Sequence, residues 1–314
     1  MNPDEPVEQL SGSTSRPVTW AELDADYTLK LPALFHPCLD ALTAAITDNF
    51  DLFGLGRRGI AAITHYVELA ATGVPIALGR PLELRYGIRL FRATLPPGPS
   101  GAPRERLLLD QRIALHSFHR AGGATDLGYD DGSGAPVQAG EFRLLQVFTR
   151  PFAPAGQRQV TEVPREFRGL AEHPFPEPPP SLERLWAAGE GLPEITPPGV
   201  LPMERVWGRG HTDINHHVTV AEYLRLLETA HVALAHGAGL PVAAHRTARV
   251  RCLFRRPFYA GECCAVQGRL LRHGTTTVLP GGIHRRGPDG ALEREPSIAA
   301  LLEGALEEAP AATS

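Results

Sequence analysis

The sequence has very little lysine and cysteine. Lys30 is its only lysine, so arginine carries nearly all of the positive charge. The cysteines are Cys38, Cys252, Cys263 and Cys264, and they form neither a CxxC pair nor a spacing typical of zinc ligands. This usage predicts free thiols in a reducing compartment, with no disulfide framework and no metal site.

Long apolar runs are also missing. No stretch approaches the roughly 20 apolar residues that a membrane-spanning helix needs. Residues 1–16 are polar and acidic, unlike the basic and then apolar order of a signal peptide. The net charge of −4 gives no electrostatic reason to expect nucleic-acid binding. We therefore expect a soluble, cytoplasmic protein without nucleic-acid or membrane partners.

Hydrophobic residues make up 43% of the 314 residues, which is enough to build the cores of two ordinary domains. Prolines cluster between Glu172 and Pro202 and favour a linker there, because proline removes a backbone donor. Ser181 to Ala188 could form a short helix inside it. The predicted segments are a disordered N-terminus (1–18), a first domain (19–166), a Pro-rich linker (167–202), a second domain (203–306) and a tail (307–314).

Each half shows the pattern of one helix followed by strands. In the second half, Thr219-Val220-Ala221-Glu222 matches a capping box, and apolar residues at helical spacing predict a helix over 220–236. In the first half we expect the helix at Ile60–Ala71. Strands are predicted at 82–94, 106–118 and 141–148, and at 249–255, 262–272, 275–279 and 291–302. This is the pattern of an α+β fold.

The residues most suited to chemistry stand just before the predicted helix of the second half. Asp213, Asn215, His216 and His217 place a carboxylate, an amide and two imidazoles at a helix N-terminus, where free amides can polarise a carbonyl. Asp213 suits a nucleophile or a base, and His217 suits a proton carrier near neutral pH. Asp and Asn also favour turns for purely local reasons, which is the competing interpretation.

The pattern Asp213-x-Asn215-x-His217-Val218, followed by Tyr223, resembles the active-site motif of plant-type acyl-carrier-protein thioesterases. Those proteins are tandem hotdogs with the catalytic site in the C-terminal lobe. The resemblance implies two tandem hotdog domains, each a long helix wrapped by an antiparallel sheet, and no cofactor. It also implies catalytic roles for Asp213, Asn215 and His217.

One family residue is missing by this resemblance. The family has Glu followed by Cys on the strand after the helix, and our alignment places Pro257 and Phe258 there. For substrate binding we predict four residues, with the arginines reaching phosphates or an acidic carrier. They are His216, Tyr223, Arg255 and Arg256.

The first half also carries a weak repeat of the second. Thr47-Asp48 precedes Gly73-Val74-Pro75 much as Thr212-Asp213 precedes Gly239-Leu240-Pro241. This comparison would make Asp48, Asn49 and Asp51 the equivalents of the second-half cluster, without a histidine. We therefore expect the first half to contribute packing and an acyl pocket.

The expected function is hydrolysis of an acyl thioester of an acyl carrier protein or coenzyme A, in fatty-acid or polyketide metabolism. A hotdog dehydratase acting on 3-hydroxyacyl thioesters, a non-catalytic acyl-binding module and a purely structural pseudo-dimer stay open as alternatives. A monomer, which is itself a pseudo-dimer, and a homodimer both fit.

Overall fold

The structure is a computed structural model that describes residues 6–95, 104–120, 134–197, 203–213, 216–241, 243 and 245–306. These residues form two compact units, one drawn from 1–28, 36–67 and 74–180 and the other from 29–35, 68–73 and 181–314. The division at 180/181 falls inside the segment expected to be a linker. In the described part of the chain, no helix is long and apolar enough to cross a membrane. The predicted tail lies outside the described residues.

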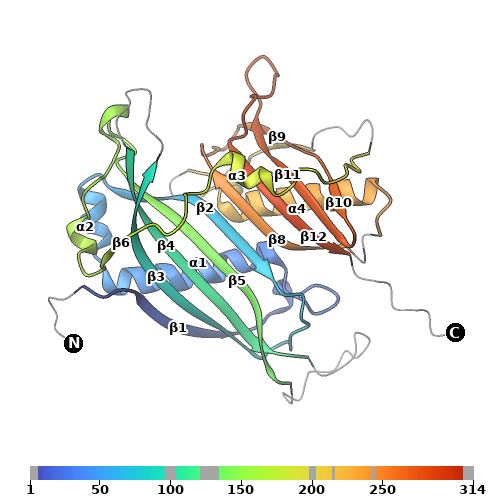
Figure 1. The fold of residues 1–314 in the computed structure, drawn as a ribbon, viewed down its shortest axis with the longest axis horizontal. Coiled ribbons are helices and arrows are strands. Elements are labelled where there is room, and N and C mark those ends of the chain that lie inside the picture. The colour runs from blue at the N-terminus through green and yellow to red at the C-terminus, as the bar shows by residue number, and fades with distance from the viewer. Residues whose placement is uncertain are drawn as a thin grey trace. The chain divides into compact units, whose positions relative to one another are not determined.

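The first unit contains an antiparallel sheet and the long helix α1 (Leu31–Asn49), most of which belongs to it (Figure 1). The strand order is β1 (Leu10–Pro17), β3 (Pro81–Leu95), β4 (Arg104–Phe118), β5 (Pro136–Thr149) and β2 (Ala61–Ala71, through Val67). A short strand, β6 (Glu172–Pro174), pairs parallel to β3. Alternate β3 side chains, such as Leu82, Leu84 and Ile88, are fully buried. Shorter elements are η1 (Trp20–Glu22), α2 (Leu52–Arg57), η2 (Ala155–Gln157) and η3 (Arg165–Phe167).

The second unit is also built from an antiparallel sheet and one long helix. Its sheet order is β8 (His245–Phe254), β12 (Ile298–Leu306), β11 (Thr276–Arg285), β9 (Cys263–Gly268) and β7 (Met203–Val206), and β10 (Leu271–His273) pairs with β11. Its long helix is α4 (Val220–Gly237), preceded by η4 (Arg209–His211). One side of α4 is buried, as the helical spacing of apolar residues predicted.

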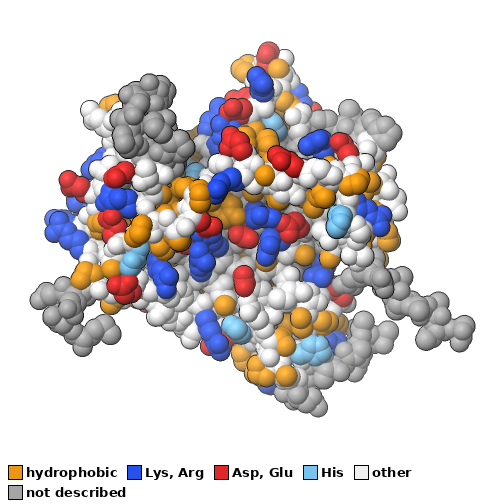
Figure 2. All heavy atoms as spheres, viewed as in Figure 1, with side chains coloured by type: hydrophobic (Ala, Val, Ile, Leu, Met, Phe, Trp, Pro, Cys, Tyr) orange, Lys and Arg blue, Asp and Glu red, His pale blue; other side chains and the backbone are white. Residues whose placement is uncertain are grey.

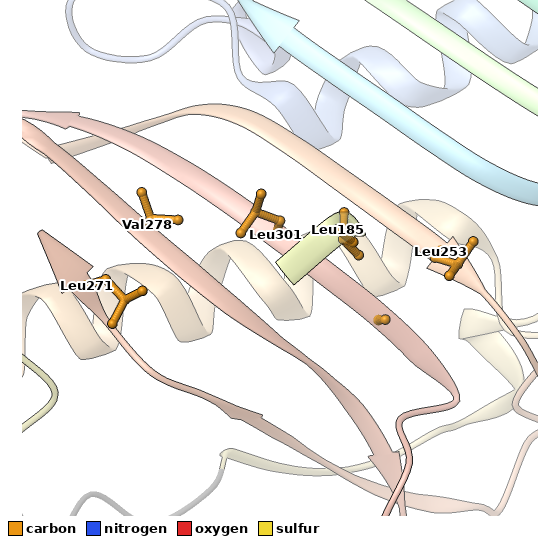
Figure 3. Close-up of a cluster of buried hydrophobic side chains, with 6 residues drawn as sticks. Leu185, Leu253, Leu271, Val278 and Leu301 are labelled. Atoms are coloured by element: carbon orange, nitrogen blue, oxygen red, sulfur yellow. The ribbon is translucent and has the colours of Figure 1, made fainter. Parts of the chain in front are cut away.

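The helix α3 (Leu182–Ala187) packs on the sheet of the second unit. Its Leu185 lies in a buried cluster with Leu253 and Leu301 (Figure 3). The indole of Trp186 donates to the carbonyls of Gly281 and Ala300, both at 3.3 Å. Five consecutive residues of β12, 298–302, are buried, because α3 and α4 provide apolar neighbours for this unit's strands.

In the second half most predicted elements match the observed ones, although the last strand begins at Ile298 instead of Ala291 and β7 was not predicted. The helix expected over 220–236 is α4, and the four strand regions become β8 to β12. β11 runs straight through Pro280-Gly281-Gly282, where a break seemed possible. A Cβ on Gly281 would lie 2.4 Å from the carbonyl oxygen of Gln267, so glycine permits close strand pairing there. Thr219 is the N-cap of α4, but its side chain makes no cap hydrogen bond, so the predicted capping box is not formed.

The ends of the first unit are more ordered than expected. Disorder over residues 1–18 is wrong for Leu10–Pro17, which form β1 and pair with β3 along its length. The linker expected over 167–202 contains the strand β6, which was not predicted, and the helix α3, which confirms the short helix expected at Ser181 to Ala188. Phe175 within it packs edge-on against Phe91, with ring centroids 5.4 Å apart. Neither segment has a strong periodicity of its own, so each is ordered by the sheet beneath it.

The helix expected at Ile60–Ala71 is wrong, because Ala61–Ala71 form β2. The β-branched and aromatic side chains of this run suit a strand. The helix of this half is α1, which contains Pro37 in its interior, a residue that ordinarily ends helices. Thr47-Asp48 therefore stand in the last turns of a helix and not before one. Their correspondence with Thr212-Asp213, and that of Asp48, Asn49 and Asp51 with the second-half cluster, is wrong.

Candidate active site

Thr212, Asp213 and residues 216–218 form hydrogen bonds with one another that close a loop immediately before α4. Thr212 and Val218 pair as an antiparallel bridge at its base. The amide of Asp213 donates to the carbonyl of His217 at 2.9 Å, and the amide of His216 donates to the carbonyl of Asp213 at 3.0 Å. A carboxylate oxygen of Asp213 accepts the amide of His217 at 3.2 Å. The loop thus holds the Asp213 carboxylate against the main-chain amide of His217.

His216 allows this loop to close. Its φ of +61° is left-handed, which non-glycine residues adopt uncommonly. Its side chain and that of Asp213 are exposed, whereas His217 is half-buried. Asn215 lies outside the described residues, so its predicted role stays a prediction.

His217 is held from the side by the turn that follows β8. It forms an antiparallel bridge with Tyr259, and the two rings meet edge to face with centroids 5.1 Å apart. The next amide, that of Val218, donates to the carbonyl of Phe258 at 2.9 Å. Tyr259 itself is 43% exposed. The imidazole therefore stands between the loop and an exposed aromatic ring.

Tyr223, predicted to bind substrate, lies inside the unit. It is 2% exposed, and its hydroxyl accepts the amide of Phe258 at 2.9 Å. Its ring packs edge-on against Trp207 with centroids 5.5 Å apart. Burial raises its pKa, so the phenol stays protonated. In this arrangement Tyr223 ties the first turns of α4 to the turn that carries Tyr259.

The turn at the family's Glu-Cys position offers no carboxylate at Pro257, which is exposed, or at Phe258, which is buried. The nearest carboxylate in sequence is that of Glu262. It accepts the amide of Tyr259 at 2.9 Å and a guanidinium N–H of Arg285 at 2.6 Å. Both of these bonds close the turn, so the role of Glu262 is to hold Tyr259 in position.

The predicted phosphate-binding arginines are engaged in ion pairs. Arg255 contacts Glu295 at 2.5 Å, and Arg256 contacts Glu293 at 2.6 Å. Arg255 lies beside Glu295 and holds the pKa of that carboxyl below its usual value. Anion binding at this place would have to compete with these carboxylates.

Cys252 and Cys264 are buried in this unit and are poor candidates for a nucleophile. Burial raises the pKa of Cys264 to about 12 and raises that of Cys252 further. Within the described residues, no group of three or more His, Cys, Asp or Glu side chains is placed to hold a metal ion.

A loop with the same backbone pattern precedes α1 in the first unit. The amide of Asp24 donates to the carbonyl of Thr28 at 2.9 Å, and the amide of Tyr27 donates to the carbonyl of Asp24 at 3.0 Å. Tyr27 has a φ of +64°. Each loop follows a 3-10 turn, η1 or η4, and each helix begins soon after, at Leu31 or Val220.

This second loop shows which residues truly correspond. Asp24, Tyr27 and Thr28 occupy the places of Asp213, His216 and His217. The aspartates and their spacing were visible in the sequence, but the surrounding residues differ so much that only the shared hydrogen bonds identify the repeat. Sequence reasoning also missed Tyr259. The one indication of it was its position two residues after Pro257.

No family model matches the sequence, and no curated protein matches it. Solved structures do match. An acyl-ACP thioesterase from Bacteroides thetaiotaomicron aligns over 95% of this chain and 98% of its own, with a TM-score of 0.58 and 11% identity. A protein from Lactobacillus plantarum described as an oleoyl thioesterase aligns over 95% and 97%, with a TM-score of 0.59 and 13% identity. The 12:0-ACP thioesterase from Umbellularia californica aligns over 95% and 98%, with a TM-score of 0.51 and 12% identity.

At identities of 11 to 13%, these structural matches establish the fold alone. The predicted α+β fold with two hotdog units is confirmed, because the chain matches double-hotdog acyl-ACP thioesterases over nearly its whole length.

Proposed function

We propose that this protein is an acyl thioesterase whose site lies in the second unit, before α4. The observation that carries the proposal is the loop in which the Asp213 carboxylate accepts the main-chain amide of His217, with both side chains at least partly accessible. The fold is shared with acyl-ACP thioesterases, and this likeness supports the proposal by analogy. The substrate would be a thioester of an acyl carrier protein or coenzyme A, from fatty-acid or polyketide metabolism.

In the proposed reaction, Asp213 takes a proton from a water that attacks the thioester carbonyl, or attacks the carbonyl itself to form an anhydride that water then opens. Amides at the start of α4 stabilise the developing oxyanion, since the first turn of a helix leaves N–H groups without internal partners. In either route the C–S bond breaks when the tetrahedral intermediate collapses, and His217 in its protonated form gives its proton to the departing thiolate. In the second route this collapse forms the anhydride, which water opens afterwards. Asn215 would orient the water or the carbonyl.

The bound substrate would also contact the predicted binding residues. His216 is exposed on the loop, and we propose that it contacts the bound substrate there. Arg255 and Arg256 would exchange their glutamate partners for phosphate oxygens of the substrate. Tyr223 would act on substrate only through the position of Phe258 and Tyr259, because its own side chain is buried.

The deciding experiment is thiol release from a panel of acyl-coenzyme A and acyl-pantetheine substrates. We expect turnover by the wild type and its loss in His217→Ala and Asp213→Asn. His236→Ala is the matched control for the first variant, because His236 is exposed at the other end of α4. Asp48→Asn is the control for the second, because Asp48 is exposed on α1.

Three results would contradict the proposal. Equal thiol release by His217→Ala and His236→Ala would place the site elsewhere. Loss of water from a 3-hydroxyacyl thioester without thiol release would identify a dehydratase instead. Tight acyl-chain binding without either reaction would identify a binding module.

A further inference from the structure

The first unit has a groove between strands β3 and β4 of its sheet and the chain segment around β6. It encloses about 750 Å³. Three guanidinium groups line it, from Arg85 and Arg89 on β3 and Arg112 on β4, together with Gln9 and His173. On the face drawn in Figure 2, arginine side chains lie over the strands of this unit. None of these residues belongs to the site before α4.

Small residues create the hollow. Gly87 pairs with Arg112 across β3 and β4, and Ala114 pairs with Arg85. A Cβ on Gly87 would lie 2.4 Å from the side-chain nitrogen of Gln9, so a larger residue would close the floor. Pro174, at the end of β6, and Pro176 form an apolar wall. The groove is therefore part of the folded architecture of the sheet and its covering segment.

Among the described residues that line the groove, Asp110 is the only acidic one, and its carboxylate is 3% exposed and shared by Arg112 and Arg143 at 2.9 Å each. Two other lining residues contact carboxylates: Arg85 contacts Glu83 at 2.7 Å, and His173 contacts Glu8 at 3.1 Å.

Arg89 differs from the other two arginines. Its Nε donates to the side-chain oxygen of Gln9 at 2.7 Å. Among the residues that the structure describes, no carboxylate lies within ion-pair distance of Arg89. Since a guanidinium has five N–H donors, most of its capacity is available to an anion.

The spacing of the three arginines indicates the ligand. Arg85 and Arg89 are separated by roughly 13 Å along a strand that rises about 3.3 Å per residue. Arg112 stands between them on the next strand, opposite Gly87. Arginine binds phosphate through paired N–H groups. A volume of this size is typical of small-molecule sites, whereas a docked protein would need a surface patch of roughly 800 Å².

We propose that this groove binds a small organic molecule that carries two or more phosphate groups, with Arg89 as the main contact. The binding is separate from the thioesterase reaction proposed above and would persist if that reaction were disproved. The apolar wall would contact the organic part of the ligand.

The test is a calorimetric titration of the full chain with inorganic pyrophosphate, ADP and adenosine at low ionic strength. We expect saturable binding of pyrophosphate and tighter binding of ADP, with no binding of adenosine. Arg89→Gln and Arg85→Gln should each weaken binding roughly tenfold or more, since each loses a charge-assisted contact. Arg57→Gln on α2 should leave the affinity unchanged, because Arg57 is exposed and distant in sequence from the groove.

Circular dichroism of each variant confirms that the fold is retained. Absence of saturable binding for both phosphate probes would overturn the proposal. Equal affinity in the wild type and Arg89→Gln would overturn it too, even if binding were observed.

Discussion

The loops before α1 and α4 share their main-chain hydrogen bonds, yet their side chains do opposite things. In the first unit, Thr28 is 1% exposed and its hydroxyl donates to Asp26 at 2.7 Å. The ring of Tyr27 is buried beneath the guanidinium of Arg120, which lies 3.3 Å from its centroid. In the second unit, the corresponding imidazole of His217 is accessible. One backbone design therefore supports a sealed loop in one unit and a candidate reactive loop in the other.

The long helices α1 and α4 also share their pattern of burial but differ in the side chains that they bury. With the loops aligned, the buried Leu34 and Leu42 of α1 correspond to Tyr223 and His231 of α4. The buried positions match along both helices, but α4 places polar groups where α1 has only apolar ones. The two units thus share the loop hydrogen bonds and the pattern of burial along the helix, and differ in the side chains at these positions.

The largest expected effect comes from giving the second loop the residue of the first. His217→Thr should reduce thiol release by about 100-fold or more, because it removes the proton carrier while threonine is tolerated at this place in the first loop. Thiol release and circular dichroism measure the two consequences. Thr28→Ala is the matched variant, and it should leave kcat unchanged. A comparable loss of kcat in both variants would break the distinction between the loops.

The second prediction concerns the buried histidine of α4. Both ring nitrogens of His231 contact threonine hydroxyls, Thr247 at 3.2 Å and Thr277 at 3.0 Å. Burial, together with the neighbouring His245, lowers the pKa of His231 to about 3. The unfolded chain binds this proton with an ordinary pKa near 6.5, so stability is lost as the pH falls from about 6.5 towards 3.

Between pH 7 and pH 5 this single group should lower the free energy of unfolding by about 2 kcal/mol. Burial also lowers the pKa of His245, which acts in the same direction. Urea unfolding at the two pH values measures the difference. His231→Leu copies Leu42 of α1 and should reduce the pH dependence, whatever its effect at pH 7. An unchanged pH dependence in this variant would contradict the assignment to His231.

A smaller effect is expected from the ring that flanks His217. Tyr259→Ala removes the edge-to-face contact and should lower kcat by about three- to tenfold, in line with the strength of aromatic pairs. Tyr259→Phe keeps the ring and should restore most of the rate. If both variants lost the same activity, the hydroxyl rather than the ring would be responsible.

The smallest effect is expected for Tyr223→Phe, which moves α4 one step towards the apolar α1. It removes the hydrogen bond from the amide of Phe258 and should cost about 1 kcal/mol of stability. KM should stay close to that of the wild type, because the side chain is buried. A marked rise in KM without loss of stability would instead support direct substrate binding by Tyr223.

Much of the second unit could be predicted from short-range patterns. The helical spacing after Thr219 and the alternation around Val250 are local features, and they identified α4 and its strands. The cluster from Asp213 to His217 was equally visible, since it lies in one continuous run before the helix. Its loop hydrogen bonds agree with the preference of Asp for turns, which is compatible with both a structural and a catalytic role.

In the first unit the strands predicted at 82–94, 106–118 and 141–148 are confirmed as β3, β4 and β5. Its other elements were harder to predict, because they depend on partners far away in the sequence. Ala61–Ala71 and Leu10–Pro17 become strands through their neighbours in the sheet, and α1 keeps Pro37 inside it.

The sequence alone thus determined the α+β class, the place of α4 and the chemical types gathered before it. The tertiary structure decided what surrounds those groups. It placed the ring of Tyr259 against that of His217 and buried Tyr223. It also showed that the loop at Asp24–Thr28 has the same main-chain hydrogen bonds as the loop at Asp213–His217. Packing and strand pairing join residues that no local pattern connects, because their free energy comes from contacts formed only when the whole unit is folded.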